Sequence, residues 1–408
     1  MKRLFLFLLA LCIIVSICGC NTEVKPPIEP STDPSTVPTQ DSPANNTQPS
    51  TPDTTEPAAQ QLPMHSISMP VYTQSTFSED GSLVFSETYQ GVSMVLPDPD
   101  VAHHVIVDIL NVIDSCNSSA TSVRDAALSD YSSASEWMPY SCQTILDPIR
   151  IDDSVLSLFG ISRVYNGSSH PTHTAVSANY DLIHGEKLTL PTLLTDVSAA
   201  EDLRDLMINA FSETDNSHLL YTDFSDTINN VLTNGLNTFE NWYLSGTGLV
   251  FFFSPYEIAP YSAGVVSAEI PYSNLVGIIN DAFFPVERIN SGELVAESFE
   301  NYNTDRFNQS CEIIQNAGSQ RIILHCGDGA VNNLKINQGF WDAEGKQFTS
   351  NATILACATV TPGDAVIIEC DIPDVMSNLQ VTYTSDGSEH TKYITQSGKD
   401  GSIILLGE

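Results

Sequence analysis

The spacing of apolar residues changes several times along the chain, and each change marks a different kind of element. Apolar and polar residues alternate over 65–96, which predicts strands, most clearly at 82–86 and 92–96. A helical period follows, with one apolar face made of Val101, Val105, Ile109, Val112 and Cys116. Asp98 can cap this helix and Pro99 can open it.

The middle of the chain mixes both periods. A helix is expected from Ser119 to about Ala134, and another begins at Ser198, where Ser198 and Glu201 have the spacing of a capping box. The Ser245–Gly248 segment lies between apolar runs and predicts a hairpin. Further strands are expected at 137–145, 155–165, 172–183, 239–244, 249–254 and 265–270. This order of strands and helices predicts an α+β fold with mixed and antiparallel sheets.

The last part of the chain has a different pattern, with short strands separated by turn residues. Strands are expected at 321–326, 333–338, 353–360, 365–370 and 379–384. Regular short strands with turn signals between them predict an all-β sandwich of immunoglobulin-like type over 289–408.

The first residues form an export signal. Lys2 and Arg3 precede an apolar run over 4–15, which is too short to span a bilayer stably. Gly19-Cys20 resembles the end of a bacterial lipobox, which implies that Cys20 is lipidated and that the protein is anchored on the outer face of the cell membrane. The alternative is an ordinary signal peptide with an incidental cysteine.

A polar segment follows, with ten prolines and eight threonines over 21–63 and no aromatic residue. Such a segment buries too little apolar surface to offset its ordering entropy, so we expect a disordered tether. The expected organisation is therefore a signal peptide (1–20), a tether (21–63), two α+β modules (64–186 and 187–288) and the sandwich (289–408).

The chain is strongly acidic. Its formal charge is −35, and removal of residues 1–20 takes away Lys2 and Arg3 but no acidic residue, which makes the charge −37. Nucleic acid and other polyanions are poor partners for such a surface. A cationic protein, a cation-rich layer of the cell wall, or solubility alone would each fit this charge.

Cysteine usage agrees with export. After Cys20, six cysteines remain, an even number that is compatible with disulfides in an oxidising compartment: Cys116, Cys142, Cys311, Cys326, Cys357 and Cys370. Cys116 and Cys142 lie in the same module and are expected to pair. The other four allow three pairings within the last module, and the sequence does not choose among them.

Two loop segments resemble a known family. The sequences over 251–264 and 270–275, Phe-Phe-Phe-Ser-Pro-Tyr-Glu-Ile-Ala-Pro-Tyr-Ser-Ala-Gly and Ile-Pro-Tyr-Ser-Asn-Leu, resemble the extracytoplasmic domain of lysozyme-sensing anti-sigma-V factors. The segments 166–171 and 181–190 are similar to the same family, although Ser168-Ser169 stands where Gly-Ala is usual. The region from His65 to Ile183 resembles the module that precedes the catalytic domain of some peptidoglycan deacetylases.

The resemblance implies a binding function and directs attention to loop residues. Ser169, His170, Tyr256, Pro260 and Tyr261 are the candidate partner-binding residues, because loops beside strands commonly present recognition groups. The alternative is that the Pro and Tyr residues only shape a turn and fill a core.

No metal or cofactor site is expected. His170 and His173 are three residues apart, a spacing that would put them on opposite faces of a strand. The sequence has none of the common hydrolase or phosphate-binding motifs, so we do not expect an enzyme.

These observations favour a lipid-anchored, non-catalytic envelope protein that binds an exported protein, for which a lysozyme-like muramidase is one candidate, or a wall component. One alternative is an envelope protein that processes glycan or assists its processing, and another is a structural surface lipoprotein.

Overall fold

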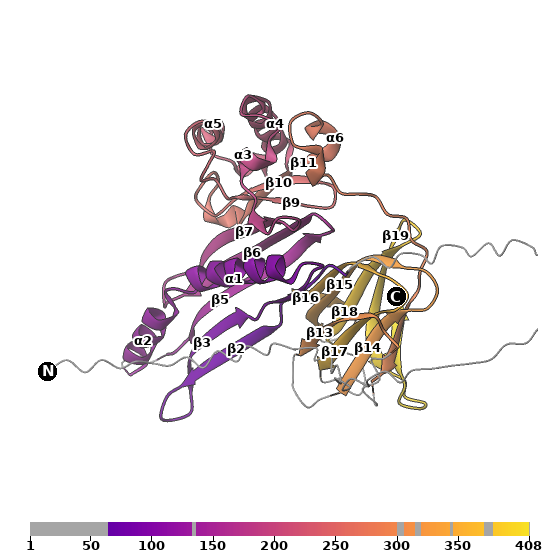
Figure 1. Cartoon of the computed structure of the whole chain (residues 1–408). Helices are drawn as coiled ribbons and strands as arrows, with labels where there is room; N and C mark the ends of the chain where they lie inside the picture. Colours follow the sequence, from indigo (N-terminus) through magenta and orange to yellow (C-terminus); the bar gives the residue numbers. More distant parts are fainter. Residues whose placement is uncertain are drawn as a thin grey trace, which may run out of the picture. The chain divides into compact units, whose positions relative to one another are not determined.

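The computed structural model describes residues 64–132, 136–299, 306–314, 320–342, 346–370 and 378–407, all within one compact unit, Ala59–Glu408. The predictions for the signal peptide, Cys20 and the tether therefore lie outside the described residues. Helices and extensive mixed and antiparallel sheets occur together, followed by a β-rich C-terminal region, so the α+β class is confirmed (Figure 1). In the described part of the chain, no helix is both long and apolar enough to cross a membrane.

A six-stranded sheet forms the first layer of the body. Its order is β2-β3-β5-β6-β7-β8, and the β3–β5 pair is parallel whereas the others are antiparallel. The strands are β2 (Val71–Phe77), β3 (Leu83–Gln90), β5 (Tyr140–Ile151), β6 (Val155–Tyr165), β7 (Thr172–Asp181) and β8 (Glu186–Lys187). The parallel pair requires a crossover, which helices α1 (Pro99–Cys116) and α2 (Ala120–Tyr131) provide.

Helix α1 begins where the sequence predicts, because Asp98 accepts hydrogen bonds from the amides of Asp100 and Val101 and Pro99 occupies the first turn. It lies along β5 and β6 in Figure 1, and its buried side chains Val105, Ile109 and Ile113 share a core with both strands. Helix α2 packs on a smaller core that includes Phe85 of β3.

A second, three-stranded sheet has the order β11-β10-β9. Its strands are β9 (Trp242–Leu244), β10 (Gly248–Phe253) and β11 (Val266–Pro271). The helices of this region are α3 (Leu190–Leu193), α4 (Ala199–Glu213), α5 (Phe224–Asn234) and α6 (Tyr272–Leu275), with short 3₁₀ turns η1 (Ser217–Leu219), η2 (Tyr261–Ala263) and η3 (Asp281–Phe283). All six residues of β10 are buried, and α4 and α5 pack against the same core.

Two local predictions for this region need correction. The capping box at Ser198 is wrong, because the Ser198 hydroxyl donates to the Asp196 carboxylate and makes no capping bond. A capping box is present instead at Thr189 and Thr192 of α3. The strand expected over 239–244 is also shorter and begins at Trp242.

The C-terminal region is a sandwich of two sheets around one apolar core. The four-stranded sheet, in the order β12-β14-β17-β13, contains β12 (Leu294–Ser298), β14 (Gln320–Cys326), β17 (Asp364–Cys370) and β13 (Gln309–Ile314). The seven-stranded sheet, in the order β20-β19-β18-β15-β16-β1-β4, contains β20 (Ile403–Gly407), β19 (Ser388–Gln396), β18 (Leu379–Ser385), β15 (Val331–Trp341), β16 (Phe348–Val360), β1 (Ser66–Ser68) and β4 (Ser93–Val95).

Strands β1 and β4 come from the beginning of the body yet complete the C-terminal sheet. Strand β1 pairs antiparallel with β16 on one side and with β4 on the other. Met64, two residues before the start of β1, is 1% exposed and belongs to the core of the sandwich. The first and last regions of the body are therefore joined by backbone hydrogen bonds.

Candidate functional site

Polar side chains of the six-stranded sheet hold the three-stranded sheet in place. Ser177 on β7 donates to the carbonyls of Glu240 and Trp242 at 2.6 and 2.8 Å, and Asn179 donates to the Trp242 carbonyl at 2.8 Å. The Ser157 hydroxyl accepts from the amide of Leu244 at 3.2 Å. Strand β9 is at the edge of its sheet, and these bonds satisfy backbone groups at and just before β9 on the side that has no neighbouring strand. They also place the β6–β7 hairpin next to the β9–β10 hairpin.

The β6–β7 loop, residues 166–171, needs a glycine. Gly167 has φ +84°, and a Cβ there would lie 2.2 Å from the Tyr140 hydroxyl. Tyr140 is itself fixed by donating to Asp130 at 2.8 Å. Beyond Gly167, the Ser168 hydroxyl donates to the carbonyl of His170 at 2.7 Å. The loop thus turns tightly over Tyr140 and leaves Ser169 and His170 exposed.

The β10–β11 loop, residues 254–265, is anchored by two buried residues in its middle. Ile258 and Ala259 are each 1% exposed and lie in the core of the small sheet. The Ile258 carbonyl accepts from the amide of Tyr221, and the Ala259 carbonyl accepts from the amide of Tyr256, both at 2.8 Å. This buried anchor holds the flanking tyrosines at the surface.

Tyr256 has an unusual backbone conformation for an exposed aromatic residue. Its φ is +76°, in the region that favours glycine, and 59% of its surface is exposed. A bulky residue in this conformation is strained, so packing alone does not explain its presence. The conformation directs attention to Tyr256 as a functional residue.

The two loops meet at Tyr261. The Tyr261 hydroxyl donates to the carbonyl of Pro171 at 2.9 Å, and its ring stacks on His170 with a centroid distance of 4.0 Å. The rings of His173 and Tyr256 lie 5.7 and 5.8 Å from the Tyr261 ring. A second link lies nearby and joins β7 to the β10–β11 loop, where the Ser254 hydroxyl accepts from the amide of Ala175 at 3.0 Å.

We call this set of side chains the Tyr261 surface: Ser169, His170, His173, Tyr256, Pro260 and Tyr261. The ring of Tyr261 brings together His170, His173 and Tyr256, and Ser169 and Pro260 are the sequence neighbours of His170 and Tyr261. Their role in binding stays a prediction. The rings are packed against one another, so the surface is ordered before any partner arrives.

His170 lies in the loop, as expected, because strand β7 begins at Thr172. The expectation that His170 and His173 lie on opposite faces of one strand is therefore wrong, and both approach the same tyrosine ring. Partial burial, together with the charges of Arg163 and His170, lowers the pKa of His173. Sequence reasoning considered His173 only as a metal ligand and overlooked it as a ring neighbour of Tyr261. Among the described residues no group of three or more His, Cys, Asp or Glu side chains is arranged to hold a metal ion.

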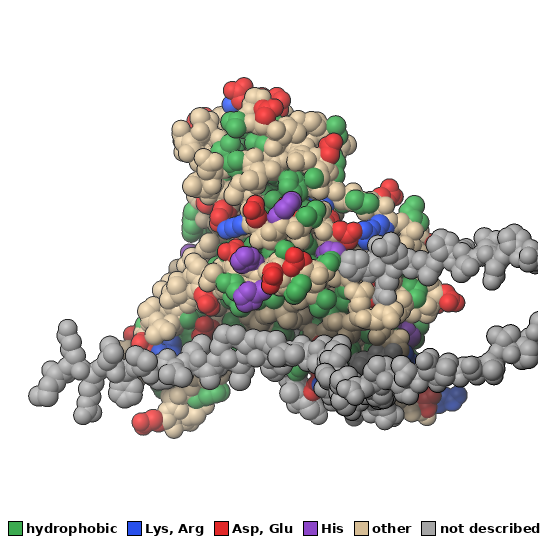
Figure 2. Space-filling model, viewed as in Figure 1, with side chains coloured by type: hydrophobic (Ala, Val, Ile, Leu, Met, Phe, Trp, Pro, Cys, Tyr) green, Lys and Arg blue, Asp and Glu red, His purple; other side chains and the backbone are tan. Residues whose placement is uncertain are grey.

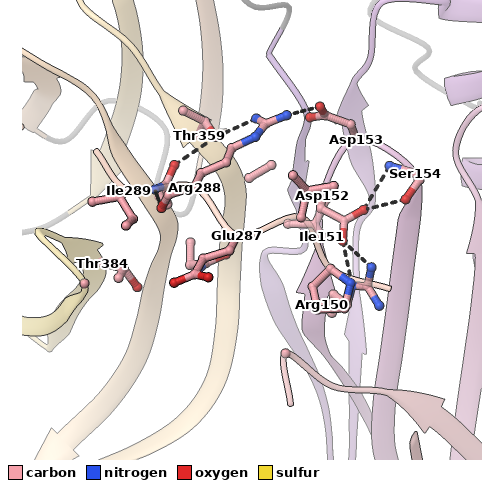
Figure 3. A pocket seen from close by; sticks show the side chains of 17 residues that line it. Arg150, Ile151, Asp152, Asp153, Ser154, Glu287, Arg288, Ile289, Thr359 and Thr384 are labelled. Atoms are coloured by element: carbon pink, nitrogen blue, oxygen red, sulfur yellow. Dashed lines mark hydrogen bonds and ion pairs between the residues drawn. The ribbon is translucent and has the colours of Figure 1, made fainter. Parts of the chain in front are cut away.

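A cleft of about 340 Å³ lies elsewhere, between the turn after β5 and the sandwich (Figure 3). Arg150 donates through Nε to Asp152 at 2.6 Å and through Nη1 to the Tyr272 hydroxyl and the Phe283 carbonyl, both at 2.7 Å. Arg288 pairs with Asp153 and donates to Thr359 at 3.2 Å.

The charged groups of this cleft thus bond mainly to other residues of its walls, as the dashed lines in Figure 3 show. The 285–289 segment connects the two regions here, and the Arg288 carbonyl accepts from Asn332 at 2.8 Å. The cleft is therefore lined by polar contacts that connect the α+β region to the sandwich.

The six cysteines are spread through both regions. Cys116 is half-buried at the end of α1 and Cys142 is buried on β5. Cys311 and Cys357 approach each other, with their sulfurs 3.8 Å apart, whereas the Cys326 thiol donates to the Val360 carbonyl at 3.4 Å. Cys370 is buried at the end of β17. The disulfide pairings stay predictions.

The chain is thus an α+β protein with a two-loop aromatic surface and a C-terminal β-sandwich. Residues 192–273, from α3 into α6, match the model of a family described as a protein of unknown function (DUF3298). The match includes Tyr256, Pro260 and Tyr261 but stops short of the β6–β7 loop. No curated protein matches the sequence.

Two solved structures are similar in part. A crystal structure of a DUF3298 family member from Bacteroides fragilis NCTC 9343 is 17% identical and covers 53% of this chain and 94% of its own, with a TM-score of 0.40. A DUF3298 family protein from Pseudomonas aeruginosa PAO1 is 18% identical and covers 54% of this chain and 97% of its own, with a TM-score of 0.38.

Proposed function

We propose that this protein is a lipid-anchored envelope protein that captures an exported partner through the Tyr261 surface. The observation that carries the proposal is the convergence of the candidate loop residues on one ring, with His170 stacked on Tyr261 at 4.0 Å and exposed Tyr256 beside it. Tyrosines offer apolar area with a polar tip and are enriched among the residues that dominate protein interfaces.

The first candidate partner is a basic lysozyme-like muramidase. The resemblance of the 251–264 and 270–275 segments to lysozyme-sensing anti-sigma-V factors supports it. The net charge supports it as well, because a chain with 50 acidic and 15 basic side chains attracts a cationic protein. Acidic side chains are distributed over the face seen in Figure 2 rather than gathered in one patch, so attraction would act on approach while the loops supply specificity.

Titration of the purified full-length chain in detergent with lysozyme, at low and moderate salt, tests this partner. We expect saturable binding that weakens with salt, because screening shortens the reach of the acidic field. Tyr256→Ala and Tyr261→Ala should each weaken binding by about tenfold or more. Tyr89→Ala, which removes an exposed tyrosine from β3, is the matched control and should leave the affinity unchanged. Absence of saturable binding at both salt concentrations would reject lysozyme as the partner.

A second candidate function is an accessory role in glycan processing, because exposed ring faces such as that of Tyr256 also suit stacking on sugars. We propose that such a role is non-catalytic. Incubation of the same protein with peptidoglycan fragments, followed by mass spectrometry, tests both points. Retention of fragments with unchanged mass would favour an accessory, whereas a change in fragment mass would show an enzyme. A structural surface lipoprotein would stay in the envelope after both tyrosines are changed and would bind neither ligand.

A further inference from the structure

Two buried cysteines face each other across the core of the sandwich. Cys311 lies on β13 of the four-stranded sheet and Cys357 on β16 of the seven-stranded sheet. Their exposed fractions are 4% and 0%, and their sulfur atoms are 3.8 Å apart. A disulfide needs a sulfur–sulfur distance of about 2.05 Å, so the sulfurs must approach by less than 2 Å, which side-chain rotation can provide.

The strand registers exclude competing pairs within the four-stranded sheet. Cys370 lies opposite Gln320, at the start of β14, whereas Cys326 lies at its far end, six residues or about 20 Å away. Cys311 lies opposite Val366, four residues or about 13 Å along β17 from Cys370.

Cys326 is also a poor partner for Cys311. Strand β17 lies between β13 and β14, so the two cysteines are separated by two strand spacings, or roughly 9 to 10 Å, across the sheet and by two further residues along it. The Cys326 thiol is directed at the Val360 carbonyl. Among the last four cysteines, the pair whose sulfurs the structure brings close together is Cys311 and Cys357.

We infer that Cys311 and Cys357 form a disulfide that joins the two sheets of the sandwich and that forms while the chain folds outside the cytoplasm. The timing follows from burial, since no oxidant reaches either sulfur once the sheets have packed. The hydrogen bond with the Cys311 thiol, together with burial, also raises the pKa of Cys357, which disfavours the reactive thiolate in the folded protein. The extracytoplasmic setting rests on the proposed function.

The chemistry is thiol–disulfide exchange with a disulfide-bearing oxidant, either a small disulfide or a thiol–disulfide oxidoreductase. One cysteine thiolate attacks the oxidant's disulfide and forms a mixed disulfide, releasing the first thiol of the oxidant. The second cysteine then displaces the other thiol. The two cysteines lose two protons and two electrons and gain one S–S bond, and the oxidant is reduced to two thiols.

The proposed Cys311–Cys357 disulfide would also stabilise the start of the body. Cys357 lies opposite Ser66 of β1 in the strand register. The cross-link would thus secure the strand on which the first residues after the tether are docked.

The direct test uses full-length protein isolated from membranes of an exporting bacterial host. The protein is denatured without reductant in the presence of N-ethylmaleimide, digested, and analysed by mass spectrometry. We expect the Cys311 and Cys357 peptides to appear joined, lighter by two hydrogens than their sum, and Cys326 to appear alkylated. Alkylated Cys311 and Cys357 on a chain that carries lipid at Cys20 would overturn this inference alone. Absence of lipid from Cys20 would overturn the anchoring proposal, and an alkylated pair in that sample would overturn both.

Thermal unfolding of Cys311→Ala, Cys357→Ala and the double variant provides an independent test. A disulfide is lost completely with either cysteine, so each single variant should lower Tm by about 5 to 10 °C and the double variant by little more. Cys326→Ala is the control for loss of a buried sulfur and should lower Tm less. Additive losses from the two single variants would show two independently packed thiols and overturn the cross-link.

Discussion

The Tyr261 hydroxyl donates a 2.9 Å hydrogen bond to the carbonyl of Pro171, a residue 90 positions earlier in the chain. This bond joins the β6–β7 loop to the β10–β11 loop at the point where the two sheets meet. The same tyrosine ring stacks on His170, so one side chain fixes both the spacing of the loops and the exposure of their aromatic residues.

Tyr261→Phe keeps the ring and removes the hydrogen bond to Pro171. We expect the free energy of unfolding to fall by about 1 kcal/mol, the usual contribution of one intramolecular hydrogen bond. Urea unfolding measures this loss, and the NMR shifts of the His170 ring report whether the stack survives. Tyr89→Phe on β3 is the control. Unchanged stability and unchanged His170 shifts would show that the bond does not hold the loops together.

Tyr256→Gly separates backbone strain from recognition. The positive φ of Tyr256 costs roughly 1 kcal/mol or more that glycine avoids, which offsets the greater flexibility of glycine in the unfolded chain. We therefore expect stability to change by less than about 1 kcal/mol while binding of the partner is strongly weakened. Asp386→Gly, another exposed residue with positive φ, should change stability in the same way and leave binding intact. Strong destabilisation by Tyr256→Gly would mean that the ring has a packing role.

Gly167→Ala tests the tight turn over Tyr140. Gly81 and Gly167 have nearly equal φ values of +83° and +84°, but a Cβ at Gly81 meets no atom within 4 Å, whereas one at Gly167 meets the Tyr140 hydroxyl at 2.2 Å. Gly81→Ala should therefore lower the free energy of unfolding by about 1 kcal/mol, through backbone strain alone. Gly167→Ala should lower it by roughly 2 kcal/mol more, through the additional clash. Denaturant midpoints of the two variants give the comparison. Equal losses would show that the loop moves away from Tyr140 at little expense.

Asp98→Ala tests the start of α1. Removing the cap should lower the free energy of unfolding by about 1 kcal/mol, because the amides of Asp100 and Val101 lose their acceptor. Asp223 occupies the same position before α5 but makes no capping hydrogen bond, so Asp223→Ala serves as the control and should have little effect. Chemical unfolding followed by circular dichroism distinguishes the two.

Lys335→Met should make stability depend on pH. Burial raises the pKa of the Asp147 carboxyl and lowers the pKa of the Lys335 amine, and each charge favours the ionised form of the other. Without Lys335, the buried Asp147 carboxylate has lost the positive charge that stabilises it. We expect the free energy of unfolding to fall by on the order of 2 kcal/mol at neutral pH.

The sign of the pH effect follows from the proton balance. With its pKa raised in the folded state, Asp147 binds its proton more tightly there than in the unfolded chain. The stability of Lys335→Met should therefore increase as the pH falls from 7 toward 4, relative to the wild-type protein. Urea unfolding at several pH values measures this. Lys399→Met, at an exposed lysine, should follow the wild-type profile.

Local signals in the sequence predict the elements whose causes are local. Asp98 and Pro99 mark the start of α1 correctly because the capping partners are the next residues in the chain. The Ser245–Gly248 hairpin is also correct, with the Ser245 amide bonded to the Gly248 carbonyl at 2.8 Å. The capping box at Ser198 fails because Asp196, two residues earlier, competes for the same hydroxyl.

Features that depend on distant partners could not be predicted in this way. The alternation over 65–96 predicts strands where β1 and β4 lie but says nothing about their partners, and β1 finds its partner β16 almost 290 residues later. The candidate loops were found through a resemblance and through their position beside strands. Their meeting at Tyr261 depends on the contact between the two sheets, which no short segment encodes.

The position of β1 also determines how the body would respond to mechanical load. Tension in the preceding segment enters at Met64 and runs along β1, which is hydrogen-bonded on both sides, to β16 and to β4. Bonds that lie across the direction of pull resist together in shear, whereas bonds at a strand end would open one after another. A load applied through Met64 would therefore be shared by both neighbours of β1, and the two flanking strands would have to give way together before β1 could leave the sheet.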